Sequence, residues 1–484
     1  MSRMNGARFV LHWSKSLIEK HPVATLLLFS LVVRLIYLFI QSTLWWDSFV
    51  YIGMGKFLFS GGEAGFFEMF RPLLHPFILG MFWKAGFDLL VSGPILDIVF
   101  SLAVVIITYK IGTTIFDKET AFDAAAICSV MPFFLMHTGL ILTEPLTMAL
   151  SLGAVYLFVL NRGYFFAGLL AGFSFLAKFP QGIILPLLIV VLFLQKKSVW
   201  EKTKHTFLLL VGFGAATLPY FFFNQSTLGN PFAPLQAGSW IVTTATWLYG
   251  SGVSYYFTHF FLIYPFFLFF FGYLYFFFQK MVVEKKIHDR SAFLLVVICL
   301  ATIGYFLSVP RKEPRYLVVI VPYLALLSTA MAGRAYHWLR QQKKPALYPK
   351  SFIIACLVLI IAFIPGPLSF EPPAYPDDLD RVFAQYPTAL PIISSNPLPA
   401  ALTDNKIISL GNMEYAAAVY AQHKEEAGLL FLTDCDLICS PDDSSCPQQK
   451  EQLIQQIDRE NLLLFDKTIK SCTSRLYQLS RGRE

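Results

Sequence analysis

Residues 22–47 read PVATLLLFSLVVRLIYLFIQSTLWWD, an apolar run that ends in two tryptophans and an aspartate. The run is long enough to form a transmembrane helix, and Arg34 is the only charged residue in it before Asp47. It is longer than the core of a signal peptide and no small-x-small cleavage site follows, so we expect it to be retained. Because tryptophans gather at membrane–water interfaces, Asp47 is expected at the boundary of the bilayer.

The composition extends this interpretation to the rest of the chain. Of the 484 residues, 56% are hydrophobic and only 14% are charged. Soluble domains average about 45–50% apolar and 25% charged residues, so the sequence predicts an α-helical polytopic membrane protein of about eleven transmembrane helices. The expected spans lie at about 22–41, 92–112, 120–137, 143–160, 164–178, 180–195, 206–224, 257–279, 292–308, 316–333 and 351–368.

Charge is distributed unevenly between two parts of the chain. Residues 1–368 contain 28 Lys and Arg against 14 Asp and Glu, whereas residues 369–484 contain 10 against 17. The acidic part is also the more hydrophilic, which predicts a transmembrane domain over 1–368 and a separate domain over 369–484. The basic excess lies in short loops between apolar runs, so no nucleic-acid partner is expected.

The segment 72–90 decides the orientation of everything after it. It is apolar but short, and it contains two prolines and two charged residues. If it does not cross the bilayer, the basic loops near 196–204, 280–290 and 334–350 all fall in the cytoplasm, as the positive-inside rule requires. We therefore expect an interfacial helix at 72–90 inside a first outer loop 43–91. The same rule predicts a cytoplasmic N-terminus and an extracytoplasmic C-terminal domain. The expected location is the plasma membrane.

The acidic C-terminal part is expected to form a small α/β domain. Short apolar runs predict strands at 391–394, 407–410, 429–432 and 462–465, with helices at 414–424 and 448–459. This part also contains an even set of four cysteines, Cys435, Cys439, Cys446 and Cys472. On an outer face they are disulfide candidates with three connectivities, and zinc binding is the alternative.

Several charged and polar residues fall in segments that this topology places on the outer face. A charge at membrane depth is unfavourable by about 2.5–3.5 kcal/mol on insertion scales, so such residues usually line an internal cavity. The set consists of Asp47, Arg71, His75, Glu144, Lys178 and the run Arg311-Lys312-Glu313-Pro314-Arg315-Tyr316. Their distribution over separate segments predicts one shared cavity.

Most of these residues also have an ordinary structural explanation. Asp47 could be the first solvated residue after an aromatic belt, Glu144 a first-turn acid of a helix, and Lys178 a snorkelling lysine. The run 311–316 could be a loop held by ion pairs to its own Glu313. Three cations in five residues on an outer face nevertheless contradict the positive-inside bias, and such a loop suits a phosphate or pyrophosphate.

The order of these motifs resembles the GT-C superfamily of polyprenyl-phosphate-sugar-dependent glycosyltransferases, in particular its protein mannosyltransferase and aminoarabinose transferase-like group. The resemblance covers about residues 20–335. It is carried by the acid after the first span, Arg71-Pro72 with Pro76, Thr143-Glu144-Pro145, Leu176-Ala177-Lys178-Phe179-Pro180 and the 311–316 run. Many members have paired acids in the first outer loop, where this chain offers Trp45-Trp46-Asp47-Ser48; Glu63 and Glu68 are the candidates for a second acid.

The resemblance implies a reaction and a set of roles. A sugar would pass from a dolichyl- or undecaprenyl-type phosphate to a hydroxyl of a protein, lipid or glycan acceptor, with inversion and with Asp47 as general base. The donor phosphate would contact Lys178, Arg71, Arg311, Lys312 and Arg315, and the substrates would contact His75, Glu144, Glu313 and Tyr316.

Three questions stay open on the sequence alone. The single acid of the Trp-Trp-Asp motif leaves open whether a divalent cation such as Mg²⁺ or Mn²⁺ takes part. A glycolipid transporter or flippase, and an oligosaccharide ligase with a pyrophosphate donor, are the alternative functions. Transporters commonly show broken spans in paired halves, and no such symmetry is visible here. The sugar and the acceptor are not specified by any motif.

Overall fold

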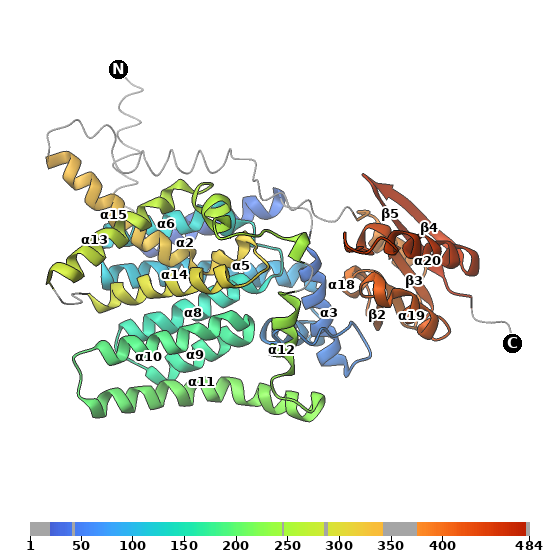
Figure 1. The fold of residues 1–484 in the computed structure, drawn as a ribbon, viewed down its shortest axis with the longest axis horizontal. Coiled ribbons are helices and arrows are strands. Elements are labelled where there is room, and N and C mark those ends of the chain that lie inside the picture. Colours follow the sequence, from blue (N-terminus) through green and yellow to red (C-terminus); the bar gives the residue numbers. More distant parts are fainter. Residues whose placement is uncertain (1–19, 41–43, 244–245, 285–288, 342–374, 481–484) are drawn as a thin grey trace, which may run out of the picture. The chain divides into compact units, whose positions relative to one another are not determined.

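The computed structural model describes residues 20–40, 44–243, 246–284, 289–341 and 375–480 (Figure 1). By its internal contacts the chain divides into two compact units. The membrane unit consists of Met1–Ser42, Leu96–Gly139 and Thr143–Pro367. The second, which we call the loop–tail unit, consists of Thr43–Ile95, Leu140–Leu142 and Leu368–Glu484. Each unit is described by itself below.

Apolar helices make up the described part of the membrane unit. They are α2 (Pro22–Ile40), α5 (Leu89–Ile115, which begins in the other unit), α6 (Lys118–Val130), α7 (Pro132–Leu135), α8 (Thr143–Val159), α9 (Tyr164–Ala177), η1 (Phe179–Ile183), α10 (Ile184–Leu194), α11 (Val199–Leu228), α12 (Ala233–Ile241), η2 (Thr246–Leu248), η3 (Phe257–Phe261), η4 (Pro265–Leu268), α13 (Phe269–Glu284), α14 (Arg290–Ser308), η5 (Pro314–Ile320) and α15 (Val321–Gln341). Six helical segments among the described residues are long and apolar enough to cross a membrane, and three apolar helices are shorter. The predicted polytopic α-helical class is confirmed.

The number and limits of the spans differ in part from the expectation of about eleven. The span expected at 120–137 is divided into α6 and α7, and Pro132 lies in the first turn of α7, a position that favours proline. The span expected at 257–279 is interrupted in the same way before Pro265, where the π-helical turn η3 gives way to η4 and α13. The span expected at 351–368 lies outside the described residues.

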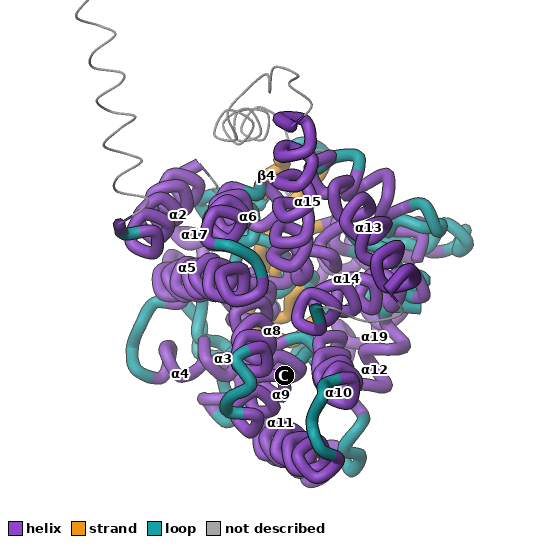
Figure 2. Tube along the Cα trace, turned by 90° about the vertical axis from the view of Figure 1, so that its left-hand side faces the viewer, coloured by secondary structure: helices purple, strands orange, loops and turns teal. Residues whose placement is uncertain are grey.

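Helices α8 to α11 form a packed group within the membrane unit. They run side by side in Figure 1 and are seen nearly end-on in Figure 2. A Cβ on Gly212 of α11 would lie 2.0 Å from the carbonyl oxygen of Phe165 in α9, so glycine is required for this close approach. Apolar side chains such as Phe222 and Val283 remain strongly exposed on the unit, as expected of surfaces that face lipid.

The loop–tail unit combines two helices of the first outer loop with an α/β region. Its elements are α3 (Trp46–Ser60), α4 (Leu74–Lys84), α17 (Leu379–Gln385), β1 (Ile392–Ser394), α18 (Leu398–Leu402), β2 (Ile407–Ser409), α19 (Met413–His423), β3 (Leu429–Thr433), η6 (Asp434–Asp436), α20 (Cys446–Glu460), β4 (Leu462–Ile469) and β5 (Cys472–Gln478). The five strands have the order β2-β1-β3-β5-β4, in which β2, β1 and β3 are parallel and the remaining pairs antiparallel. The four predicted strands and both predicted helices are present, whereas β5, α17 and α18 were not predicted.

Residues 43–91, which were expected to form a loop with one helix, contain two helices. Residues 46–60, for which no helix was expected, form α3, and the helix expected at 72–90 is shorter, 74–84, with α5 starting at Leu89. The backbone N–H of Trp45 donates to Ser48 Oγ (3.1 Å), which supports the start of α3. Gly61 ends the helix in the left-handed conformation, with its N–H bonded to Phe57 O.

The sheet is covered on both faces. Because side chains alternate along a strand, Ile392 and Phe431 point to one face and Ile393 and Leu430 to the other. The first face packs against α17, α18 and, from the first outer loop, α3, whereas the second packs against α19 and α20. Helix α3 is therefore part of the core of the α/β region.

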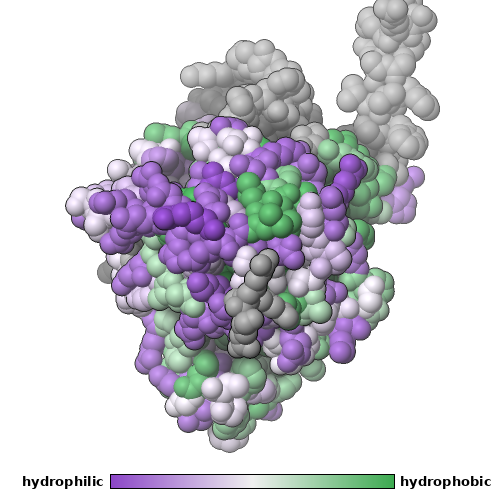
Figure 3. Space-filling model, turned by 90° about the vertical axis from the view of Figure 1, so that its right-hand side faces the viewer, coloured by the Kyte–Doolittle hydropathy of each residue, from purple (hydrophilic) through white to green (hydrophobic). Residues whose placement is uncertain are grey.

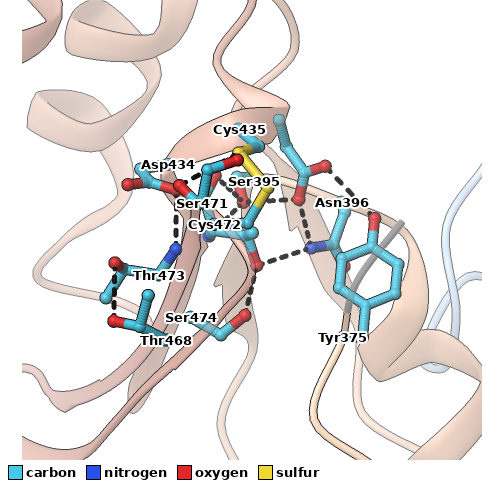
Figure 4. The surroundings of a disulfide bond; sticks show 12 residues. Tyr375, Ser395, Asn396, Asp434, Cys435, Thr468, Ser471, Cys472, Thr473 and Ser474 are labelled. Atoms are coloured by element: carbon cyan, nitrogen blue, oxygen red, sulfur yellow. Dashed lines mark hydrogen bonds between the residues drawn. A yellow bond between two sulfur atoms is a disulfide. The ribbon is translucent and has the colours of Figure 1, made fainter. Parts of the chain in front are cut away.

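The four tail cysteines form two disulfides. Cys435 pairs with Cys472, joining η6 to the start of β5 (Figure 4), and Cys439 pairs with Cys446. This is one of the three connectivities that the sequence allowed, and it leaves no free thiolate among these four for the zinc alternative. The side of the molecule drawn in Figure 3 is mainly hydrophilic, with an apolar patch above its centre and smaller apolar areas elsewhere.

Candidate active site

Asp47 lies in the first turn of α3 and forms part of a three-residue ion-pair group. Arg71 Nη2 lies 2.7 Å from Asp47 Oδ1, and Arg71 Nε lies 2.9 Å from Glu68 Oε2. The side chains are largely buried, with 13%, 18% and 20% exposure for Asp47, Arg71 and Glu68. Two carboxylates thus share one guanidinium, and the group carries a net charge of −1 when both are ionised.

The pKa values of Glu68 and Arg71 are shifted by burial and by the charges of the other members of the group. Burial raises the pKa of Glu68, the Arg71 guanidinium opposes this shift, and the charge on Asp47 adds to it. For Arg71, burial disfavours the charge, but Asp47 and Glu68 outweigh it and the pKa of Arg71 is raised. Arg71 therefore stays a cation whatever happens to either carboxylate.

Aromatic side chains enclose the same guanidinium. Its carbon lies 5.6 Å from the ring centroid of Tyr51 and 5.3 Å from that of Phe70. Tyr51 in turn packs edge-to-face on His75, with ring centroids 5.3 Å apart. His75 lies in the first turn of α4 and is 1% exposed, so its ring and that of Tyr51 pack together in the interior. Glu63, the other candidate for a second acid, is exposed to solvent, and Glu68 is the one that pairs with Arg71.

A second group of charges lies in the membrane unit. Lys178 Nζ is 2.6 Å from Glu144 Oε1 at the start of α8, and Lys178 also lies over the ring of Tyr316, 5.9 Å from its centroid. Lys178 occupies the extended residue between α9 and η1, where Pro180 begins a new helical turn. Two of the residues predicted to share a cavity are thus direct partners, and Tyr316 adjoins them.

The run 311–316 is organised around Glu313. Arg311 Nη2 lies 2.6 Å from Glu313 Oε1 and Arg315 Nε 2.5 Å from Oε2, while Tyr316 OH donates to Oε1 (2.9 Å). These are the internal ion pairs that the structural explanation of this run predicted. Together with Glu144 and Lys178, however, the group contains three cations and two carboxylates, so one positive charge remains in excess.

Lys312 points away from this group. Its ammonium donates to the carbonyl oxygens of Leu307 (2.8 Å) and Val309 (2.7 Å), with Phe306 O at 3.4 Å. Lysine is well placed at a helix C-terminus because it satisfies the last carbonyls. Lys312 therefore anchors the loop to the end of α14. For this reason we do not assign it to the donor phosphate.

Two side chains that the sequence analysis did not select belong to the second group. His137 is fully buried and interacts electrostatically with Glu144, Lys178 and Arg315. Tyr249 stacks under Arg311, with the guanidinium carbon 3.5 Å from its ring centroid. An imidazole in an otherwise apolar segment was a usable signal for His137. Tyr249 carried none, because it is one of 22 tyrosines in the chain.

The described residues do not provide a convincing metal site. The cation between Asp47 and Glu68 is the guanidinium of Arg71. Among the described residues, one group of three metal-ligand side chains is close enough together, Asp434 with Cys435 and Cys472, and these two cysteines are bonded to each other.

Comparison with known proteins gives a family match and several similar structures. The model of the family "Dolichyl-phosphate-mannose-protein mannosyltransferase" matches residues 71–223. ArnT from Cupriavidus metallidurans bound to undecaprenyl phosphate is similar with a TM-score of 0.64 at 13% identity, over 95% of this chain and 98% of that one. A search of curated proteins found no match.

Two further structures share the architecture. The archaeal oligosaccharyltransferase AglB from Archaeoglobus fulgidus, in complex with an inhibitory peptide and a dolichol-phosphate, has a TM-score of 0.56 at 12% identity, over 96% of this chain and 75% of that one. The mycobacterial arabinofuranosyltransferase AftD has a TM-score of 0.51 at 12% identity, over 95% and 41%. One AglB structure is a complex with Zn and sulfate. The chain therefore has an α-helical membrane-protein fold similar to that of these three solved structures, and residues 71–223 match the mannosyltransferase family model.

Proposed function

We propose that this protein transfers a monosaccharide from a polyprenyl phosphate to a hydroxyl acceptor on the outer side of the membrane, with inversion at the anomeric carbon. The observation that carries the proposal is the pair of charge groups just described. One holds a buried carboxylate in a fixed orientation, and the other holds an excess of positive charge in an apolar unit. The polyprenyl phosphates bound to ArnT and AglB support a donor of this class.

Asp47 is the proposed general base. A hydroxyl that attacks an anomeric carbon must lose its proton, and a positioned carboxylate can accept it. Arg71 fixes the orientation of the Asp47 carboxylate through Oδ1, and we assign this carboxylate to the acceptor proton. Glu68 fixes Arg71 from its other side and so completes the support of the base.

Lys178, Arg311 and Arg315 are the proposed ligands of the donor phosphate. Negative charge grows on the phosphate as the glycosidic bond breaks, and preorganised cations in a site with little water stabilise it strongly. The partners of these cations, Glu144 and Glu313, hold them in position before the donor arrives. A phosphate is already a good leaving group, so we assign no separate acid catalyst.

The proposal is tested with the purified full chain in lipid nanodiscs and radiolabelled prenyl-phosphate sugars. Mannosyl, glucosyl and arabinosyl donors are compared, with product detected as free prenyl phosphate plus labelled acceptor or free sugar. Turnover of one donor, lost in Asp47→Asn, is the expected result. Turnover only with a prenyl-pyrophosphate oligosaccharide would indicate a ligase. Movement of the intact donor across the bilayer of proteoliposomes, without bond cleavage, would indicate a transporter.

A further inference from the structure

Helix α3 presents two opposite faces to two different partners. Asp47, Tyr51 and Gly55 are spaced at four-residue intervals and therefore share one face of the helix. This face meets Arg71 and His75 through Tyr51, and the backbone of α4 approaches Gly55. Phe49, Gly53 and Lys56 are spaced by four and three residues and lie about 180–240° around the axis from Asp47.

The second face of α3 is held by the α/β region. Phe49 belongs to the apolar core that covers one side of the sheet and packs edge-to-face on Tyr375, with ring centroids 6.2 Å apart. Gly53 lies against Phe66 and Ala400 of α18, in a space that a Cβ would fill. The helix that carries Asp47 is therefore fixed by residues about 330–350 positions later in the chain.

Lys56 forms the polar part of this attachment. Its ammonium lies 2.9 Å from Asp404 Oδ1 and 2.8 Å from Thr403 O. The lysine side chain is only 6% exposed, whereas Asp404 is 68% exposed. Asp404 also accepts a hydrogen bond from Trp83 Nε1 of α4 (3.1 Å), so one tail residue contacts both helices of the first outer loop. A buried ammonium is unfavourable without such partners, and the lysine would not be retained there by packing alone.

The loop that carries Glu68 and Arg71 is attached at the same place. Gly65 N–H donates to Asn405 O (2.9 Å), and Ile407 N–H donates to Gly65 O (2.8 Å), next to the edge strand β2. Gly65 has φ +69°, and a Cβ there would lie 2.0 Å from Gly53 O. Residues 403–407 therefore contact both the helix of Asp47 and the loop of its partner Arg71.

We infer that the C-terminal α/β region orients the proposed base, with Lys56 and Asp404 as positioning residues for glycosyl transfer. This inference rests on the proposed function of Asp47. Lys56 is nine residues from Asp47, about 14 Å along the helix axis, so it acts through the orientation of α3 and not on the reacting atoms. A catalytic carboxylate must be held to within about 0.5 Å, and a small rotation of α3 would misplace it.

The test measures kcat and the donor KM for Lys56→Met, Lys56→Arg and Asp404→Ala in the full chain in nanodiscs. We expect Lys56→Met to lower kcat about tenfold with KM within about twofold of wild type, because donor binding is assigned to residues of the membrane unit. Lys56→Arg can keep both contacts and should restore most of kcat. Asp404→Ala removes an exposed carboxylate and leaves Thr403 O, so it should fold and lose about threefold in kcat.

Lys424→Met is the matched control, because it breaks the exposed Lys424–Glu460 pair (3.0 Å) in the same unit but away from α3. Rates are expressed per folded molecule, and backbone hydrogen exchange of α3 is followed in each variant. Faster exchange in residues 46–52 together with the loss of kcat supports positioning. If Lys56→Met and Asp404→Ala fold and keep wild-type kcat, or if Lys424→Met loses as much, the inference is wrong. If wild type transfers no sugar, it is the proposed function that fails.

Discussion

Arg71 Nη2 lies 2.7 Å from Asp47 Oδ1 and thereby fixes the one acid of the Trp-Trp-Asp motif. The same guanidinium binds Glu68 through Nε, so its two edges hold two carboxylates. An Arg fork is rigid and planar, and it orients its partners more strictly than a lysine ammonium would. A substitution of Asp47, Arg71 or Glu68 is therefore expected to affect the other two side chains of the group.

Asp47→Asn should abolish most of the transfer activity. The asparagine oxygen can still accept from Arg71, so the fold should be kept while the base is lost. A general base contributes about 10²–10⁴-fold, and a loss of that size in kcat is expected. Initial rates with the active prenyl-phosphate sugar measure it, with the exposed tail residue Asp442→Asn as control. Wild-type turnover in Asp47→Asn would rule out this base.

Glu68→Gln should lower kcat more than Glu63→Gln does, although both variants remove an acid from the same loop. Glu68 holds Arg71, so its loss frees one edge of the guanidinium, and we expect kcat to fall about tenfold. Glu63 is exposed, and the corresponding change should be less than twofold. The comparison identifies which acid, if either, belongs to the site. Equal losses in the two variants would argue against the support role of Glu68.

Lys178→Gln should weaken stabilisation of the departing phosphate. The variant leaves Glu144 without its cation and removes the excess positive charge of the group. Loss of one preorganised donor typically lowers kcat by about 10²–10³-fold. Lys202→Gln in the same unit is the control, because the Lys202 ammonium donates to Phe193 O and is not part of the Glu144–Lys178 group. A change in the donor KM alone would show that Lys178 binds the donor without acting on the transition state.

The sequence predicted the general architecture and part of these contacts. Span length and composition were sufficient to predict the polytopic class, and short apolar runs predicted four of the five strands. Lys178 and Glu144 were expected in one region and are direct partners. Helix α3 was not expected, since Gly53 and Gly55 and several aromatic residues weaken the local helix signal. It is stabilised by packing on residues about 350 positions later, which local sequence cannot reveal.

The role of Lys312 shows the same limit at the level of one side chain. A Lys between Arg311 and Glu313 has the composition of a phosphate-binding loop. The direction in which the Lys312 side chain points depends on where α14 ends. The carbonyl oxygens of Leu307 and Val309, to which it donates, lie at that end of the helix. Similarly, the pairing of the four tail cysteines required the positions of η6 and β5, which spacing alone left among three alternatives.

Treatment with EDTA should leave the activity of the purified enzyme largely unchanged. The cation between Asp47 and Glu68 is Arg71, and among the described residues neither acid belongs to a group of three metal ligands. We expect less than a twofold change in rate after dialysis against the chelator, compared with dialysis against buffer. Restoration of a lost activity by Mg²⁺ or Mn²⁺, but not by removal of EDTA alone, would contradict this expectation.

Asp436 should make the stability of the loop–tail unit depend on pH. It follows β3 and accepts hydrogen bonds from Asn396 Nδ2 (2.6 Å) and Tyr375 OH (3.2 Å). Both donors are labelled in Figure 4. Burial raises the pKa of this carboxyl from 3.8 to about 6, although bonds from Asn396, Tyr375, Ser395 and Thr433 oppose the shift. The folded protein therefore keeps the proton to higher pH than the unfolded chain does.

The sign of the effect follows from this difference. The stability linked to the proton is fully present below pH 3.8 and is lost as pH rises through about 6. A shift of this size corresponds to at most about 3 kcal/mol. Asp436→Asn cannot ionise, so its thermal midpoint should rise relative to wild type between pH 4.5 and 7.5, in the same lipid and buffer system. The contributions of the other titrating groups to the pH dependence are the same in both proteins, so they cancel in the difference between the two thermal midpoints. A difference between the two midpoints that does not change with pH would show that Asp436 is already ionised throughout this range.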